Sequence, residues 1–468
     1  MNRLTIGLIV VVSAALGWAV YASIAKEPSD AGVMLGNIVN LAAMDKNASD
    51  PFLQAATDGR VLLSWTEKPD PKERGRNAYL AALNGQGAPV APRRINDIEG
   101  HVHWYGGDNR LKFSTAADGT VTALWQAPLS SEFKISNVHF ASASPDGAFS
   151  ASSMLNDDIS DPPVAHAFSA VKTAPNGKVY ATWIDGRNRT FEGMGEAKST
   201  SERRADIKMR DLTIPEYARK AAPQTRRNFA QPNSQLYMAV SDDGGQTFGE
   251  NYPITDIQVC ACCVPNIAFL DGGDTVIVSY RNVTGVSLRD NVVIRSIDGG
   301  QTFSKPKYFS EDGWIARFCP HAGPSMISDA AGNLHISWFT PGKSEPGDEG
   351  IYYATSEDGG LTWSDRERLA STPSHTVLHA EIVSDANGRL WVVWENFAEG
   401  GMKPRIYLAH RGPNDTGWSE TVQISAADTV TSMLPTIAAN GNGVYLSWIE
   451  KNGEDSQVKV RTVSIPVS

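Results

Sequence analysis

Seven short segments with the same pattern recur along the 468-residue chain. In each, a turn residue such as Gly, Asp or Asn precedes a run of alternating residues that ends near a Trp or Tyr. The segments cover residues 59–65, 119–125, 177–183, 274–280, 333–338, 389–394 and 444–448. They lie about 54 to 60 residues apart, apart from one gap of about 97. A repeat of this length predicts an array of similar sheets that pack side by side.

Each unit contains room for four short strands with period-2 alternation. In the sixth unit, for example, we expect strands at 380–384, 389–394, 405–410 and 421–425. The composition, with 41 Gly, 26 Pro, 12 Trp and 20% charged residues, agrees with an all-β protein. The sequence therefore predicts a β-propeller of seven four-stranded blades in one domain. Six blades with an irregular first unit is the alternative.

The last unit ends soon after its third strand, which we expect at 457–464. Residues 36–41, near the other end of the chain, form a strand-like run that could supply the fourth strand. Such a strand would close the ring and leave no unpaired sheet edge between the first and last blades.

A second motif, S-x-D-G-G-x-T-[FW], occurs three times, at residues 241–248, 296–303 and 356–363. The paired glycines allow positive φ in a tight turn, and the Asp can accept hydrogen bonds from turn amides. The motif resembles the Asp box of the sialidase-like (BNR-repeat) β-propeller family. That resemblance implies a structural role for Asp243, Asp298 and Asp358, in hairpins away from a catalytic face.

The resemblance covers most of residues 50–468. Members of the family typically have six blades, hold a substrate carboxylate with three arginines, and use a Tyr/Glu nucleophile pair with an Asp acid/base. The early Arg-Ile-Pro motif of the family does not occur here. Arg187, Arg281 and Arg289 are candidates for an anion clamp. No Tyr/Glu pair can be assigned, so the catalytic residues stay unknown.

Cysteine and histidine have an unusual distribution. In a propeller, the connections that lead from the outermost strand of one blade to the innermost strand of the next converge on the axis at one face. Ten of the thirteen Cys and His residues lie in these connections or at their ends. They are His101, His103, His166, Cys260, Cys262, Cys263, Cys319, His321, His375 and His379.

We expect nine of these residues, all except His375, to form a metal site on the upper axial face. Thiolate and imidazole ligands suit copper, zinc or iron better than magnesium or calcium. Copper is the first expectation for an oxidising compartment, with zinc or no metal as alternatives. Four cysteines could instead form structural disulfides, with Cys319 pairing to one of the other three, or provide a redox-active thiol pair. The Cys-x-Cys-Cys and Cys-Pro-His strings resemble an offshoot of the family often described as exo-alpha-sialidase.

The N-terminal residues 1–29 read as a signal peptide or a transmembrane anchor. Residues 4–25 are almost entirely apolar and long enough to span a bilayer, and 23–25 offer a small-x-small cleavage site. Either interpretation places the propeller, residues 30–468, outside the cytoplasm. We therefore expect a periplasmic or extracytoplasmic protein, membrane-anchored or secreted, that touches the membrane only through this segment.

The long gap between repeats corresponds to an insertion at residues 187–233. It contains 11 Lys and Arg against 6 Asp and Glu, within a chain whose net charge is -10. It could cover the site or dock an anionic small molecule, a glycan or a protein; a solvated loop is the alternative. The acidic balance argues against nucleic acid as a partner.

Three functions remain open from the sequence: a propeller with a Cys/His copper site, an exo-sialidase-type glycoside hydrolase on anionic sugars, or a non-catalytic binding propeller with structural disulfides. Whether the protein is an enzyme is uncertain at this stage. If it is one, a sialidase-like hydrolase or a copper-dependent oxidoreductase is expected.

Overall fold

A computed structural model describes most of the propeller. The described residues are 27–28, 32–41, 47–70, 72–103, 109–129, 135–158, 163–188, 234–284, 288–316, 321–343, 348–370, 377–397, 403–426, 430–441 and 443–466. The apolar run at 4–25, Cys319, His375 and nearly all of the 187–233 insertion lie outside these residues. No helix in the described part is long and apolar enough to cross a membrane.

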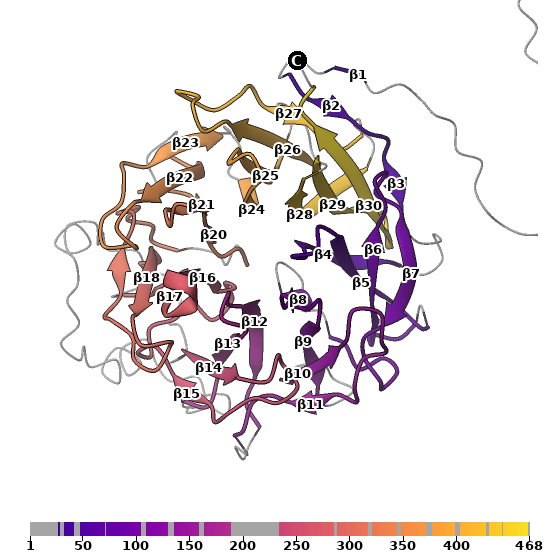
Figure 1. Cartoon of the computed structure of the whole chain (residues 1–468), viewed down its shortest axis with the longest axis vertical. Helices are drawn as coiled ribbons and strands as arrows, with labels where there is room; N and C mark the ends of the chain where they lie inside the picture. The colour runs from indigo at the N-terminus through magenta and orange to yellow at the C-terminus, as the bar shows by residue number, and fades with distance from the viewer. Residues whose placement is uncertain are drawn as a thin grey trace, which may run out of the picture.

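Seven antiparallel sheets surround a central axis, and the chain visits them in order (Figure 1). The seven-bladed prediction is confirmed, and the six-bladed alternative is wrong. The first three blades contain β4 (Ser49–Ala55), β5 (Val61–Glu67), β6 (Asn77–Leu83), β7 (Pro89–Arg94); β8 (Lys112–Thr115), β9 (Val121–Pro128), β10 (Ser136–Ala143), β11 (Ser153–Met154); and β12 (His166–Thr173), β13 (Val179–Asp185), β14 (Gln235–Ser241), β15 (Tyr252–Pro253).

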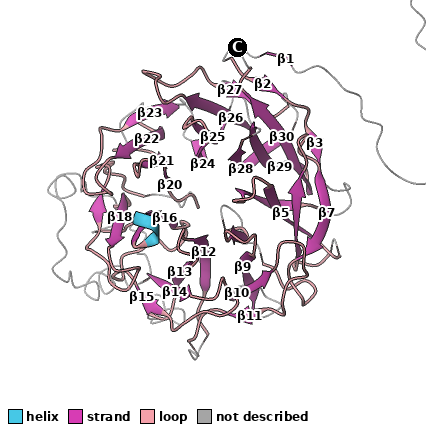
Figure 2. Cartoon of the chain, viewed as in Figure 1, coloured by secondary structure: helices cyan, strands magenta, loops and turns pink. Residues whose placement is uncertain are grey.

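The next three blades follow the same order. They contain β16 (Asn266–Leu270), β17 (Thr275–Arg281), β18 (Asn291–Ser296), β19 (Lys307–Tyr308); β20 (Ser325–Ser328), β21 (Leu334–Thr340), β22 (Gly350–Ser356), β23 (Glu367–Ala370); and β24 (Val377–Ser384), β25 (Leu390–Phe397), β26 (Pro404–Arg411), β27 (Val422–Gln423). The first strand of each blade lies innermost, next to the axis (Figure 1). Strands dominate the described part, which has one short 3-10 turn at Asp271–Gly273 (Figure 2).

The seventh blade joins the two ends of the propeller. It contains β28 (Thr431–Asn440), β29 (Gly443–Asn452) and β30 (Asp455–Ser464), and β2 (Met34–Leu35) and β3 (Val39–Asn40) pair with β30. A further short strand, β1 (Glu27–Pro28), pairs with β2. Between the pairs, Gly36 N donates to Thr462 O at 2.8 Å and Leu41 N donates to Val458 O at 3.0 Å. The predicted closure by an N-terminal strand is confirmed.

The aromatic residue that ends each repeat lies in the core. The seven residues are at most 3% exposed: Trp65, Trp125, Trp183, Tyr280, Trp338, Trp394 and Trp448. Burial of one such side chain contributes about 4 to 6 kcal/mol to folding before entropy is subtracted. Several indole N–H groups also have acceptors, such as Asp185 Oδ2 for Trp183 and Asp312 Oδ2 for Trp338, both at 2.9 Å. The aromatic residue of each repeat is therefore part of the buried core of the propeller.

The three Asp-Gly-Gly turns follow one hydrogen-bond scheme. In the first, Asp243 Oδ1 accepts from Thr247 N at 2.9 Å and Gln246 N at 3.0 Å, and Asp243 Oδ2 accepts from Thr247 Oγ1 at 2.6 Å. Gly244 and Gly245 have φ of 72° and 87°, where a side chain would be strained. Asp298 and Asp358 accept equivalent bonds from Thr302 and Thr362.

Candidate thiol site

The Cys-Ala-Cys-Cys segment connects β15 to β16, so it belongs to one of the connections that lead toward the axis. Val259 forms an isolated bridge with Asn282, and Cys260 N donates to Arg281 O at 2.9 Å. These bonds hold the segment against the end of β17. As a result, Cys260 and Cys263 are 0% and 1% exposed.

The three sulfur atoms of this segment form a cluster. Cys260 Sγ lies 3.4 Å from Cys263 Sγ and 3.6 Å from Cys262 Sγ. Cys262 is disulfide-bonded, whereas Cys260 and Cys263 are free thiols. The sequence left two roles open for the cysteines, disulfide bonds and thiolate ligands. Both occur within these four residues, because one sulfur is in a disulfide and two are free thiols.

Two buried arginines control the charge of this thiol pair. Arg289 Nη1 donates to Cys260 Sγ at 3.6 Å. The hydrogen bond from Cys263, and then the positive charges of Arg289 and Arg281, lower the pKa of Cys260 although burial opposes the shift. Burial, followed by the neighbouring Cys260 sulfur, raises the pKa of Cys263. The pair therefore favours one thiolate that accepts a hydrogen bond from one thiol.

The same arginines were two of the three candidates for an anion clamp. Arg281 and Arg289 are each 1% exposed. Arg281 donates to the carbonyl oxygens of Arg289 at 3.1 Å and Phe339 at 3.0 Å, and its guanidinium lies 4.8 Å from the ring centroid of Trp314. To bind a substrate carboxylate, these buried guanidinium groups would have to give up hydrogen bonds to backbone carbonyl oxygens and to the Cys260 sulfur.

Arg187, the third clamp candidate, belongs to a separate charged cluster with His166. Its guanidinium pairs with Asp185 Oδ2 at 2.9 Å and Asp157 Oδ1 at 3.0 Å, and it lies 4.0 Å from the centroid of the Tyr237 ring. His166 Nε2 lies 2.7 Å from Asp158 Oδ1 and 3.5 Å from Asp185 Oδ2.

Burial opposes protonation of His166, but hydrogen bonds with Asp158 and Asp185 outweigh it and raise its pKa to about 9. His166 is therefore an imidazolium at neutral pH. The imidazolium pairs with both carboxylates in this geometry. Its ring nitrogen and one oxygen each of Asp158 and Asp185 also lie within 4.8 Å of one another, so these three residues are a second group that could hold a metal ion once the imidazole loses its proton.

The other candidate histidines lie in different surroundings. Nδ1 of His101, Nδ1 of His321 and Nε2 of His379 are buried without a hydrogen-bond partner among the described residues. The rings of His101 and His139 lie 5.1 Å apart, and burial followed by the charge of Arg74 lowers the pKa of His103 to about 4. His379 Nδ1 lies 2.8 Å from Glu395 Oε1. His321 lies 5.9 Å from the Phe168 ring, between centroids, and burial followed by the charge of His379 lowers its pKa.

Of the nine residues expected to form one metal site, the described structure groups the sulfur atoms of Cys260, Cys262 and Cys263, and Cys319 lies outside the described residues. In the described part of the chain, no imidazole joins the group of ligand atoms that lie within 4.8 Å of one another at Cys260, Cys262 and Cys263. Sequence reasoning also missed Asp158, and it assigned Arg289 to a substrate rather than to a thiolate. The position of Cys260 just before an innermost strand was the available signal for the cluster, but no local pattern indicates which side chain faces it.

Among known proteins, similarity to this chain is found in solved structures. No protein-family model matches the sequence, and no curated protein matches it. An ulvan lyase from a new polysaccharide lyase family, solved with a bound glycan, matches with a TM-score of 0.52 and 13% identity, over 90% of this chain and 95% of that chain.

Two further solved structures give lower scores. A protein of unknown function from Dyadobacter fermentans DSM 18053 has a TM-score of 0.48 at 12% identity, over 93% of this chain and 100% of its own. Trypanosoma rangeli sialidase in complex with sialic acid has a TM-score of 0.45 at 12% identity, over 85% of this chain and 58% of its own. At such identities the likeness concerns the fold and not the chemistry. The chain is a β-propeller similar in fold to the polysaccharide lyase.

Proposed function

We propose that the protein is an exported, sialidase-like propeller that binds copper as Cu(I) through Cys260 and Cys263. The observation that carries this proposal is the pair of buried free thiols, 3.4 Å apart, with a guanidinium donor on one sulfur. Soft thiolates select Cu(I) over harder cations. A zinc site normally needs four ligands, and the described residues offer only two free thiols here.

The charge of the surroundings also favours this ion. Two thiolates and one Cu(I) carry a net charge of about -1, which the nearby guanidinium groups of Arg281 and Arg289 would offset. Two metal–sulfur bonds of about 2.3 Å span at most about 4.6 Å. The thiols would therefore have to separate by about 1 Å for a nearly linear site, a small movement for a connecting segment.

Titration with Cu(I) under anaerobic conditions, against a competing chelator, tests the proposal. We expect one Cu(I) per chain with the parent protein, and loss of at least tenfold in affinity for Cys260→Ser and for Cys263→Ser. Ser304→Cys, which adds a thiol on the far side of the Asp298 turn, is the control for non-specific thiol binding and should leave the affinity of the first site unchanged.

Two results would overturn the copper proposal. The first is a parent protein that binds no Cu(I) although a thiol count finds Cys260 and Cys263 reduced. The second is a Cys260→Ser/Cys263→Ser double variant that still binds one ion with parent affinity, because the ligands would then lie elsewhere. Thermal melting of each variant shows whether it is folded.

The glycoside hydrolase alternative predicts a different result. It requires release of product from a fluorogenic sialoside by the parent protein, with loss of activity in Arg187→Met. The buried positions of Arg281 and Arg289 give this alternative no support from the geometry of the site. We therefore expect no release above the uncatalysed background.

A further inference from the structure

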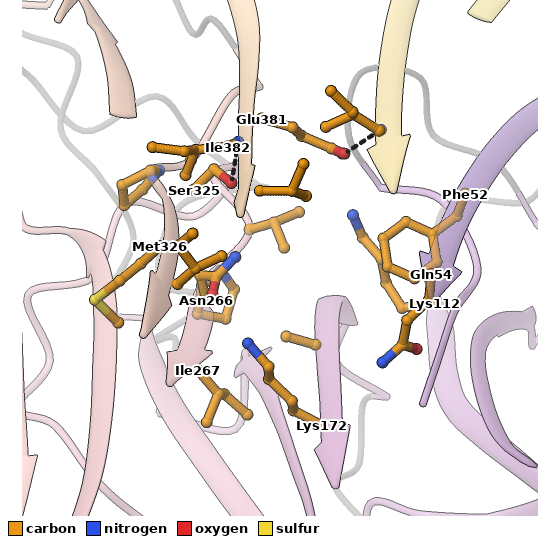
Figure 3. Close-up of a pocket in the computed structure, with 18 of the residues that line it drawn as sticks. Phe52, Gln54, Lys112, Lys172, Asn266, Ile267, Ser325, Met326, Glu381 and Ile382 are labelled. Atoms are coloured by element: carbon orange, nitrogen blue, oxygen red, sulfur yellow. Dashed lines mark hydrogen bonds between the residues drawn. The ribbon is translucent and has the colours of Figure 1, made fainter. Parts of the chain in front are cut away.

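A cavity of about 170 Å³ occupies the propeller axis, and Val264, the residue after Cys263, forms part of its lining. Innermost strands of all seven blades contribute to its wall, from Phe52–Gln54 of β4 round to Ile437 of β28. Most of the side chains that line it are apolar. The exceptions are a few polar groups that point inward from different blades (Figure 3).

Two of these groups are lysines. Lys112 comes from β8 and Lys172 from the neighbouring innermost strand β12. Lys112 is 8% exposed, and its ammonium lies 4.5 Å from the centroid of the Phe52 ring. No carboxylate in the described part of the chain pairs with Lys172, and burial lowers its pKa to about 8. At neutral pH the cavity therefore contains a protonated lysine without a counter-ion from the described residues.

The one acidic side chain in the wall is already neutralised. Glu381 Oε1 lies 3.4 Å from Arg110 Nη2, and Glu381 Oε2 accepts hydrogen bonds from Thr436 Oγ1 at 2.8 Å and Ile437 N at 3.2 Å. Among the described residues, the wall therefore offers no free carboxylate to Lys172, and a poorly solvated positive charge without a partner is costly.

Two side-chain amides add uncharged donors. Gln54 from β4 and Asn266 from β16 line the same cavity, and Figure 3 shows them projecting toward it together with the ammonium of Lys172. Gln54 Oε1 is buried without a hydrogen-bond partner in the described structure. Its amide is therefore not fixed by the protein and can turn to present N–H to a ligand.

The size of the cavity limits what it can hold. Its volume is below the roughly 300 Å³ at which sites for drug-sized ligands begin. A compact anion with a few waters fits this volume.

We propose that the axial cavity binds a small inorganic oxyanion, held by the ammonium groups of Lys172 and Lys112 with the amides of Gln54 and Asn266 as further donors. The anion links strands of four blades and supplies the negative charge that the wall lacks. This site uses none of the residues proposed to bind copper.

Calorimetric titration with sodium sulfate at pH 7, in a buffer without other polyvalent anions, tests this inference. Sulfate keeps one charge state through the neutral range, so protonation of the probe does not contribute. We expect saturable binding of one sulfate per chain, loss of at least tenfold in affinity in Lys172→Met, and a smaller loss in Gln54→Met. Lys305→Met removes the same charge from an exposed position and should bind sulfate like the parent.

Thermal melting separates a lost site from a lost fold. Without sulfate, Lys172→Met should melt at or above the parent temperature, because the variant removes a poorly solvated charge that no carboxylate of the described residues pairs with. With sulfate, the parent and Lys305→Met should gain stability and Lys172→Met should gain less. Sulfate binding that is absent in the parent, or equal in the parent, Lys172→Met and Gln54→Met, overturns the proposal.

Discussion

At Cys260, one neighbouring thiol and two guanidinium groups decide the charge of a single sulfur atom. The sequence placed Cys260, Cys262 and Cys263 in a connection near the axis because propeller topology brings such connections together. It could not distinguish the disulfide-bonded Cys262 from its free neighbours, because that choice depends on the directions of Cβ atoms in segments far apart in the chain. Nor could it show that Arg289, 29 residues away from Cys260, donates to its sulfur.

The charged cluster at His166 makes stability depend on pH. The pKa of His166 is raised from 6.5 to about 9 in the folded state. The resulting stabilisation is fully present below pH 6.5 and is lost as the pH rises through 9, and it amounts to on the order of 3 kcal/mol. The groups that face this imidazole are Asp158, Asp185 and, through Asp185, Arg187.

Chemical denaturation of the parent protein between pH 6 and pH 9.5 measures this dependence. We expect His166→Gln to be less stable than the parent at pH 6, and the difference to shrink toward pH 9.5. His335→Gln changes a histidine with another Asp partner in a different blade, and corrects for general effects of removing a ring. A constant difference across the range would show that His166 is not protonated in the folded protein.

At the scale of the element, the Asp-Gly-Gly turns were predictable because their contacts are local. Every partner of the Asp243 carboxylate lies within four residues of it. The residues of the axial cavity show the opposite case. Lys172 and Gln54 lie on strands of different blades, and period-2 alternation indicates that they face inward without showing which charges they meet.

Removal of the Asp243 carboxylate should weaken the turn between β14 and β15. Asp243→Ala leaves Thr247 N and Gln246 N without their acceptor, and we expect a loss of about 1 to 2 kcal/mol in unfolding free energy. Asp242→Ala is the matched control, because its exposed pair with Lys178 at 2.8 Å contributes little. Urea denaturation of both variants measures the effect, and equal stabilities would mean that the turn does not need the carboxylate.

At the scale of the whole molecule, closure of the ring depends on a segment more than 400 residues from its partner strand. The sequence predicted this pairing from the missing fourth strand of the last unit, and β2 and β3 do pair with β30. The contact is more than backbone pairing. Val33 is 0% exposed and packs in the same cluster as Trp391 and Trp448, so the N-terminal segment belongs to the core between the last blades.

Deletion of residues 1–41 should therefore open the ring. It exposes the backbone of β30 as an unpaired edge and uncovers the apolar cluster at Val33, so we expect a lower melting temperature and self-association. Deletion of residues 1–31 keeps β2, β3 and Val33 and should leave the melting temperature near that of the same propeller with residues 1–25 removed. Val33→Ala in the shorter deletion should cost about 1 to 3 kcal/mol, because it leaves a cavity in the cluster. Melting by calorimetry and mass by light scattering measure the two effects. A monomeric 42–468 fragment with an unchanged melting temperature would mean that three strands suffice for the seventh blade, and that β30 tolerates a free edge.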